Sequence, residues 1–201
     1  MVFESMWVLV PAVLLLCFPL DGLLRGEVRF GQVDQMFLRG RKRRLSVWNT
    51  AMLAIDPLRA AGGAYLLIAG LRQVDPIGGG LMAEATMPLL MGAILFVALI
   101  AQLVTRRDPE YLLAPVGFSA GLIVQLMSPS VAAIALLAGF VALAGVRAWS
   151  AYFLVAAVAC AGGGFALMEL DRVTPLVLGS VLVLPGIAGM LTGRHLMMPG
   201  R

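Results

Sequence analysis

The chain has 201 residues, of which 61% are hydrophobic and only 13% are charged, and its formal net charge is +4. An ordinary soluble domain carries about 25% charged residues, so this sequence lacks the charge to cover a water-facing surface. The mean hydropathy of +0.96 excludes a disordered chain as well. We therefore expect an all-α integral membrane protein, with residues 1–201 forming a single polytopic membrane domain.

Seven apolar stretches are long enough for a helix that crosses the membrane, which takes about 20 residues. They lie near 6–24, 57–74, 88–104, 109–127, 129–146, 149–168 and 175–193. No basic residue precedes the first stretch, so we interpret it as a retained span and not as a cleavable signal peptide. The sequence thus predicts a seven-transmembrane-helix bundle with one basic amphipathic cytoplasmic segment, which lies in the long connection 25–55.

The connection 25–55 contains apolar residues at helical spacing, namely Phe30, Val33, Met36 and Phe37. This spacing predicts a short amphipathic helix in the membrane interface. A basic cluster and an interfacial tryptophan follow: Arg39, Arg41, Lys42, Arg43, Arg44 and Trp48. The cluster is interpreted either as a topology signal alone or as a site for anionic lipid headgroups or an acidic partner. Nothing beside it would position a nucleic acid, so no nucleic-acid partner is expected.

Proline marks the expected beginnings of several helices. Asp, Ser and Thr cap helix N-termini, and proline suits the first helical position. Four dipeptides have this form: Asp56-Pro57, Asp108-Pro109, Ser128-Pro129 and Thr174-Pro175. Pro115 and Pro185 have no such cap and fall inside predicted spans, where kinks are expected.

Every Asp, Glu, Lys and Arg side chain falls outside the predicted spans or within about one turn of a span end. Because proton relays and ion paths need such groups inside the membrane, we do not expect an ion-coupled transporter. Asp56 and Arg59 share a helix face and form a candidate polar pair, either a cap with a snorkelling arginine or a polar binding spot. Gln102 and Gln125 are expected to hydrogen-bond to neighbouring helices.

Small residues recur at helix-packing spacing in the predicted spans from 109 onward. The glycines are Gly117, Gly121, Gly139, Gly162, Gly163, Gly164, Gly189 and Gly193. Small faces let helix backbones approach closely, which predicts a tight bundle or a bundle docked on another subunit. Three consecutive glycines at 162–164 also weaken a helix, so a locally unwound segment that lines a cavity is the alternative.

The segment Gly117-Phe-Ser-Ala-Gly121 matches the G-x-S-x-G pattern. In position it resembles the serine sequence of rhomboid intramembrane proteases, which lies on their fourth helix after a long first loop. Those enzymes use a histidine on a later helix, whereas the only histidine here, His195, follows the last predicted span. A serine without a base is a weak nucleophile, so we do not expect a protease.

Few side chains suit metal or redox chemistry. Cys17 and Cys160 lie inside apolar stretches, and one histidine cannot build a haem or zinc site that needs several. We therefore expect no catalytic residue, no metal and no cofactor.

The basic residues predict the orientation of the chain. All but Arg72 and Arg172 of the 15 basic residues fall on one side of the seven predicted spans. Basic connections stay in the cytoplasm, so the N-terminus is expected outside and the C-terminus inside. Lys42 is the only lysine, which we interpret as a sign of a high-GC bacterium and hence of the inner membrane.

These features predict a non-enzymatic membrane protein that is an accessory, scaffold or assembly subunit of a larger membrane complex. The alternative is an uncoupled transporter or channel for a neutral or amphiphilic small molecule or lipid, which Pro115, Pro185 and the glycines at 162–164 suggest. The expected partners are a bilayer with anionic headgroups and other membrane subunits or further copies of the chain.

Overall fold

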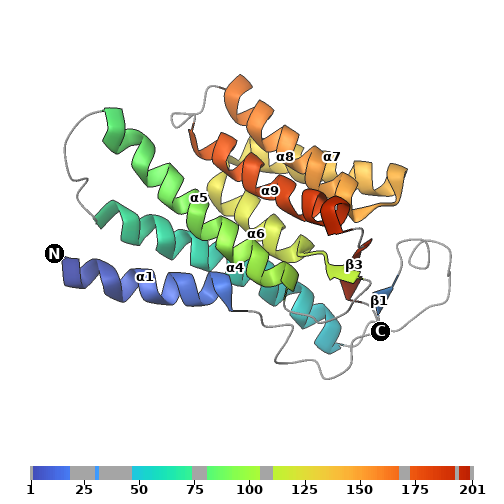
Figure 1. Ribbon diagram of the computed structural model, residues 1–201, viewed down its shortest axis with the longest axis horizontal. Coiled ribbons are helices and arrows are strands. Elements are labelled where there is room, and N and C mark those ends of the chain that lie inside the picture. The colour runs from blue at the N-terminus through green and yellow to red at the C-terminus, as the bar shows by residue number, and fades with distance from the viewer. Residues whose placement is uncertain are drawn as a thin grey trace.

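The computed structural model describes residues 2–18, 30–31, 47–73, 81–104, 111–167, 173–192 and 195–199. Within these residues it contains seven α-helices and three short strands (Figure 1). The helices are α1 (Val2–Cys17), α4 (Val47–Gln73), α5 (Leu81–Val104), α6 (Val116–Leu126), α7 (Pro129–Val146), α8 (Trp149–Ala166) and α9 (Val173–Thr192). The strands are β1 (Phe30–Gly31), β2 (Tyr111–Leu113) and β3 (His195–Pro199).

Four of the described helices are long and apolar enough to cross a membrane. They are α5, over Thr86–Leu103, together with the whole of α7, α8 and α9. Helices α1 and α6 contain shorter apolar stretches, Trp7–Cys17 and Val116–Leu126. The fold is therefore helical, and its long apolar helices are compatible with a membrane location.

The helices pack into one bundle in which sequence neighbours and distant segments lie side by side. Helix α8 packs between α7 and α9, and α1 lies along α4 (Figure 1). Helix α4 packs on α6, while α5 contacts both α9 and α1. The buried core runs through all these interfaces and includes Leu67, Leu99, Leu122 and Leu178, each fully buried.

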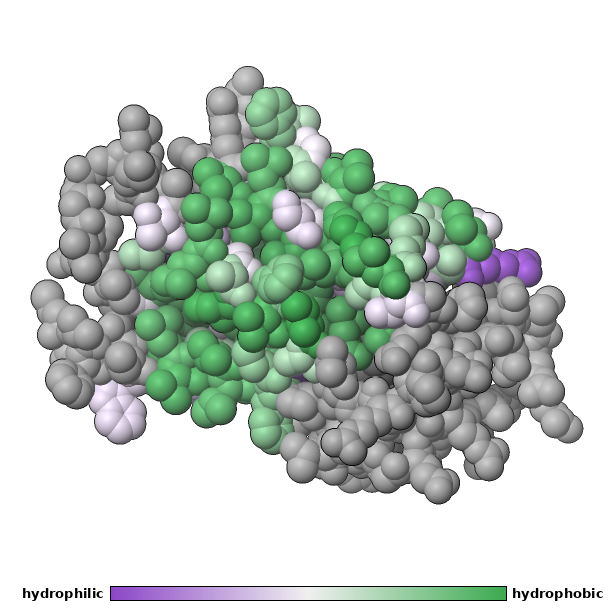
Figure 2. Space-filling model, in the orientation of Figure 1, coloured by the Kyte–Doolittle hydropathy of each residue, from purple (hydrophilic) through white to green (hydrophobic). Residues whose placement is uncertain are grey.

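The outward faces of the helices are also apolar. Figure 2 shows one face of the molecule, on which hydrophobic residues form a continuous surface between the ends of the bundle. Leu137 and Val141 of α7, Val158 of α8 and Leu191 of α9 are all more than half exposed. A contiguous apolar surface of this kind is rare on soluble monomers, whereas it suits contact with lipid or another membrane helix.

The three strands form one small sheet with the order β1-β3-β2. Strand β3 pairs antiparallel with β1, with Gly31 opposite Met198, and parallel with β2, with Leu112 opposite Leu196. Because β1 lies between α1 and α4, β2 lies between α5 and α6, and β3 follows α9, the sheet gathers these segments at one end of the bundle (Figure 1). We call it the sheet end.

The proline dipeptides predict helix beginnings correctly in one case and wrongly in others. Helix α7 begins as expected, with Pro129 at its first position and the Ser128 hydroxyl accepting a hydrogen bond from the Val131 N–H at 3.4 Å. Helix α4 instead begins at Val47, so Pro57 lies inside it and Asp56 is not its N-cap. Contacts with α6, described below, hold Pro57 within the helix, although proline is costly there.

Other predicted boundaries also need correction. The segment predicted as a span over 109–127 is extended in β2, and its helix begins only at Val116, because the residue before Pro115 avoids helical geometry. Pro115 therefore precedes a helix and is not a kink inside one. Helices α5 and α9 begin before Pro88 and Pro175, at Leu81 and Val173. A helix can continue through a proline in a membrane, because its other backbone N–H and carbonyl groups remain hydrogen-bonded.

The predicted amphipathic helix in the connection 25–55 is wrong at its start. Phe30 and Gly31 form strand β1, since the backbone of these two residues bonds to β3. The rest of that predicted helix and the basic cluster lie outside the described residues.

Candidate functional site: a polar cluster at the end of α1

Arg59 is the most deeply buried charged side chain that the structure describes. Its side chain is only 4% exposed, and its Nη2 lies 2.9 Å from Oδ1 of Asp56, whose side chain is 25% exposed. The two residues are three apart and share a face of α4, as the sequence predicts. The expected position at the beginning of a helix is wrong, however, because α4 continues for nine residues before Asp56.

Arg59 and Gln102 bind the C-terminal end of α1. The Nη1 of Arg59 donates to the carbonyl of Phe18, and the Nε2 of Gln102 donates to the carbonyl of Leu16 at 3.1 Å. The same amide lies 3.5 Å from the Phe18 carbonyl. The last carbonyls of a helix have no partner within it and carry partial negative charge, so a cation and an amide donor stabilise this end.

The same ion pair also lies at the beginning of α6. The Arg59 guanidinium carbon is 5.4 Å from the centre of the Phe118 ring, a cation–π distance. A Cβ placed on Gly117 would lie 3.3 Å from Cβ of Asp56 and 3.9 Å from its Oδ2. Helix α6 has no side-chain cap of its own, and the partial positive charge of a helix N-terminus attracts a carboxylate.

We name Asp56, Arg59, Gln102 and Phe118, with the carbonyls of Leu16 and Phe18, the Arg59 cluster. It joins α1, α4, α5 and α6 at one level of the bundle. Its cation lies at the negative end of one helix, and its anion lies at the positive end of another. Within this cluster, Nε of the guanidinium is the one buried side-chain atom without a hydrogen-bond partner. The cluster therefore neutralises its own charges and fixes the relative positions of four helices.

Two of the predicted glycine sites are contact points between helices that this cluster joins or neighbours. A Cβ on Gly121 would lie 2.8 Å from the Cα of Pro57 and 2.9 Å from Cβ of Ala60, so α6 approaches α4 at backbone distance. A Cβ on Gly139 of α7 would lie 2.9 Å from the ring of Tyr152 in α8. Each glycine removes the atom that would keep the two helices apart.

The three consecutive glycines of α8 do not unwind it, since the helix continues to Ala166. A Cβ on Gly163 would lie 3.4 Å from Val131, and Gly164 packs directly against the side chain of Pro175. Gly162 has open space beside it. The structure therefore shows packing at two of these three positions and an intact helix at all of them.

The remaining predicted glycines contribute less to the described structure. Gly189 is partly buried in α9, and Gly193 lies outside the described residues. The glycines that do bring α9 and α8 together are Gly179, whose Cβ would lie 2.9 Å from the carbonyl oxygen of Ala157, and Gly186. Gly179 and Gly186 are seven residues apart, which places them on one helix face about two turns apart. This spacing in the sequence could have identified them as a packing face.

Of the predicted basic cluster and its interfacial tryptophan, the structure describes only the backbone of Trp48. Arg39, Arg41, Lys42, Arg43 and Arg44 lie outside the described residues. Trp48 lies in the first turn of α4, with its side chain outside what the structure describes.

Ser119, the centre of the G-x-S-x-G segment, is fully buried inside helix α6. Its hydroxyl donates to the Val116 carbonyl at 2.9 Å, so its proton is used within its own helix. The strand-to-helix turn that exposes a nucleophilic serine in hydrolases does not occur at this position. The described residues also contain no group of three or more His, Cys, Asp or Glu side chains that could hold a metal ion.

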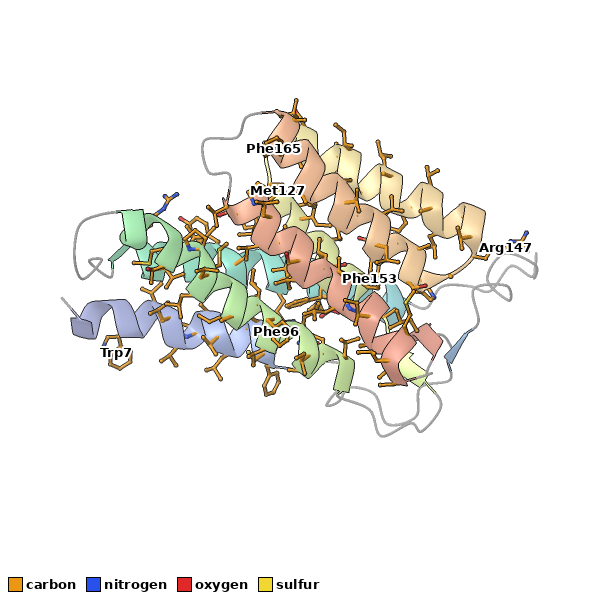
Figure 3. All side chains as sticks on the ribbon, turned by 45° about the horizontal axis from the view of Figure 1, so that its top comes forward. Trp7, Phe96, Met127, Arg147, Phe153 and Phe165 are labelled. Carbon is orange, nitrogen blue, oxygen red and sulfur yellow. The ribbon has the colours of Figure 1, made fainter. Side chains whose placement is uncertain are left out.

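Figure 3 shows how the side chains are distributed along these helices. Trp7 and Phe165 point away from the bundle at its periphery, whereas Phe153 lies among the helices. Arg147, the exposed C-cap of α7, points outward at one extremity of the molecule. Apolar side chains thus occupy the interior and the flanks alike, and the Arg59 cluster is the main polar element between them.

Comparison of the chain with protein-family models, curated proteins and solved structures gives no match. The functional proposal below is therefore based on the geometry of the described residues.

Proposed function

We propose that this chain is a non-enzymatic polytopic membrane protein that serves as an accessory, scaffold or assembly subunit of a larger membrane complex. One observation carries the proposal: the buried charged and amide side chains of the Arg59 cluster bind the ends of other helices in the same chain. A cluster of this kind gives a rigid bundle, which a subunit needs in order to present fixed faces to its neighbours.

The proposed topology has seven spans, with the N-terminus outside and the C-terminus in the cytoplasm of a bacterial inner membrane. Three features support it. Four of the described helices are long and apolar enough to cross a membrane, the connections that carry β1 and β2 meet the C-terminal strand at the sheet end, and the sequence concentrates its basic residues in those connections. Cysteine-scanning accessibility in intact cells tests this topology. Labelling of Gly31→Cys by an impermeant maleimide from outside the cell contradicts it.

The proposed partners are anionic headgroups for the basic cluster and another membrane subunit, or a further copy of the chain, for the apolar faces. The outward faces offer large side chains for such contacts, for example Leu14 of α1, Leu137 of α7 and Leu191 of α9. Large exposed apolar patches mark sites of contact with other proteins or with the membrane.

Purification in mild detergent from the native membrane tests the subunit proposal. We expect a second membrane protein or a second copy to co-elute in a fixed ratio. Leu14→Trp, Leu137→Trp and Leu191→Trp, made one at a time, locate the contact face, since only the variant on that face should lose the partner. A stable monomer at native expression level, with no partner retained, contradicts the proposal.

A second candidate is an uncoupled transporter or channel for a neutral or amphiphilic small molecule or lipid. The feature that favours it is Pro185, which is buried inside α9 and leaves the Val181 carbonyl without its usual helical N–H. Flux from liposomes, changed by Gly163→Leu, supports this candidate. Liposomes that stay inert over a broad panel of neutral solutes and lipids remove it.

A further inference from the structure

Two buried hydrogen-bond donors lie one turn apart at the beginning of α8. The Nε1 of Trp149 and the hydroxyl of Tyr152 are out of contact with solvent, and neither has a hydrogen-bond partner among the described residues. Tyr152 is fully buried and Trp149 is only 6% exposed. Because residues three apart share a helix face, and because both side chains belong to one buried cluster, the two donors form a single polar feature.

The side chains around these donors are apolar. They come from the beginning of α6, the end of α7, α8 itself and β3, and they are Ala114, Val116, Leu143, Phe153 and Leu196. A donor that is buried in such surroundings without a partner destabilises the fold, since it gives up its hydrogen bonds with water. Native structures rarely leave such groups unpaired, so the two donors point to an acceptor that the described residues do not supply.

Ser119 of α6 lies beside the Tyr152 hydroxyl but does not satisfy it. The Ser119 proton is donated to the Val116 carbonyl at 2.9 Å, and the phenol oxygen makes no hydrogen bond of normal distance and angle. The phenol ring is held on two sides. A Cβ on Gly139 would lie 2.9 Å from it, and the Phe153 ring, which lies among the helices in Figure 3, meets it edge-on at 5.2 Å.

We propose that Trp149 and Tyr152 bind a neutral, apolar molecule that offers a carbonyl oxygen, either the ester group of a lipid or a quinone dissolved in the membrane. The indole N–H only donates and the phenol O–H can donate, so the ligand has to accept. The N-terminus of α8 adds partial positive charge beside Trp149, since Ala148 provides no side-chain cap. The apolar surroundings exclude a charged ligand.

The position of the site suits a ligand that arrives from the bilayer. Helix α8 is apolar enough to cross a membrane from its first residue, Trp149, so in a membrane this residue lies near the level of the lipid ester groups. Phe140 of α7 is 48% exposed, and its ring centre is 5.1 Å from that of Tyr152. Movement of the Phe140 side chain gives a ligand a route to the phenol between α7 and α8.

The fluorescence of Trp149 tests the site. The chain has three tryptophans, so Trp7→Phe together with Trp48→Phe leaves Trp149 as the only one. The full chain is purified in a detergent that has no carbonyl group and titrated with dioctanoylglycerol, with decylubiquinone and with tetradecane, which has no acceptor. At least one carbonyl probe should change the emission saturably, whereas tetradecane should not. A response to dioctanoylglycerol alone identifies the ligand as a lipid ester, and a response to decylubiquinone alone identifies it as a quinone.

Tyr152→Phe in the same chain removes one donor and keeps the ring. The affinity for the carbonyl probe should fall by about threefold to tenfold, which is the effect of one hydrogen bond. The matched control is Tyr65→Phe, since Tyr65 is 61% exposed on α4 and should not affect binding. Phe140→Ala should speed the association of the probe. Leu137→Ala, one turn earlier on the exposed flank of α7, should leave the association rate unchanged.

Thermal unfolding without any probe gives a second measurement. Because Tyr152→Phe removes an unpaired donor, Tm should stay the same or rise. A lower Tm would show that the phenol already has a partner within the chain, and it overturns the proposal. Tetradecane binding as tightly as the carbonyl probes, no emission change with any probe, or an affinity unchanged by Tyr152→Phe also overturns it. The site goes beyond the proposed function, and these measurements need no partner protein, so their failure leaves the subunit proposal standing.

Discussion

Arg59→Met removes the cation from the Arg59 cluster while keeping the side chain long and apolar. The substitution leaves the Asp56 carboxylate without its partner at 2.9 Å and the Phe18 carbonyl without its charged donor. Losing one member of a buried ion pair costs about 3–5 kcal/mol. Because the Asp56 side chain is 25% exposed and water reaches it, we expect a loss of about 3 kcal/mol in the free energy of unfolding.

Thermal unfolding in one detergent, followed by circular dichroism, measures this loss. For a chain of this size, a loss of about 3 kcal/mol lowers Tm by about 6–12 °C. Arg59→Lys keeps the charge but not the two-pronged donor geometry, so its Tm should lie between those of the native chain and Arg59→Met. The control is Arg72→Met, an exposed arginine in the last turn of α4, which should change stability by no more than about 0.5 kcal/mol.

A double-mutant cycle separates the ion pair from simple loss of packing. Asp56→Leu leaves a guanidinium that is only 4% exposed, so its cost should equal or exceed that of Arg59→Met. The double variant should lose less than the sum of the two single losses, because each single change leaves an uncompensated partner. If Arg59→Met lowers Tm no more than Arg72→Met, or if the two losses simply add, the cluster does not hold the four helices together.

Two further predictions concern helix contacts and helix ends. Gly121→Ala places a methyl group against the backbone of Pro57 and should lower the free energy of unfolding by about 1–3 kcal/mol, as overpacking does. Gly62→Ala meets open space and should instead stabilise the helix by about 1 kcal/mol. Equal Tm shifts for the two variants would contradict the close approach of α4 and α6. Ser128→Ala removes the acceptor for the Val131 N–H and should cost about 1 kcal/mol, read from the same melting curves; an unchanged Tm would show that this cap is not formed.

The positions of the helices follow from the sequence more closely than their ends do. Each described helix overlaps one of the predicted apolar stretches, because a long apolar segment favours a helix, in which the backbone groups bond to one another. The positions of the prolines predicted the helix beginnings less well. Pro129 begins a helix as predicted, whereas Pro57 lies inside one because α6 offers glycine against it. That compensation comes from a helix some 60 residues away, which local reasoning does not consider.

The Arg59 cluster shows the same division between local and distant information. The spacing of Asp56 and Arg59 was enough to predict that they pair. Nothing in the sequence near them indicates that the Phe18 carbonyl and Gln102 complete the cluster, since these residues lie more than 40 positions away. The sequence also predicted that Arg59 lies in the first turn of its helix, whereas Arg59 is buried well inside the 27-residue helix α4.

The central place of β3 in the sheet has a consequence for the order of assembly. Phe30 and Gly31 pair with residues that follow α9, so these backbone hydrogen bonds cannot form until the six described helices from α4 to α9 have been synthesised. Contacts between residues so far apart in the sequence form late in folding, because a long loop must close before they are made. The sheet is therefore expected to form after the helices that surround it.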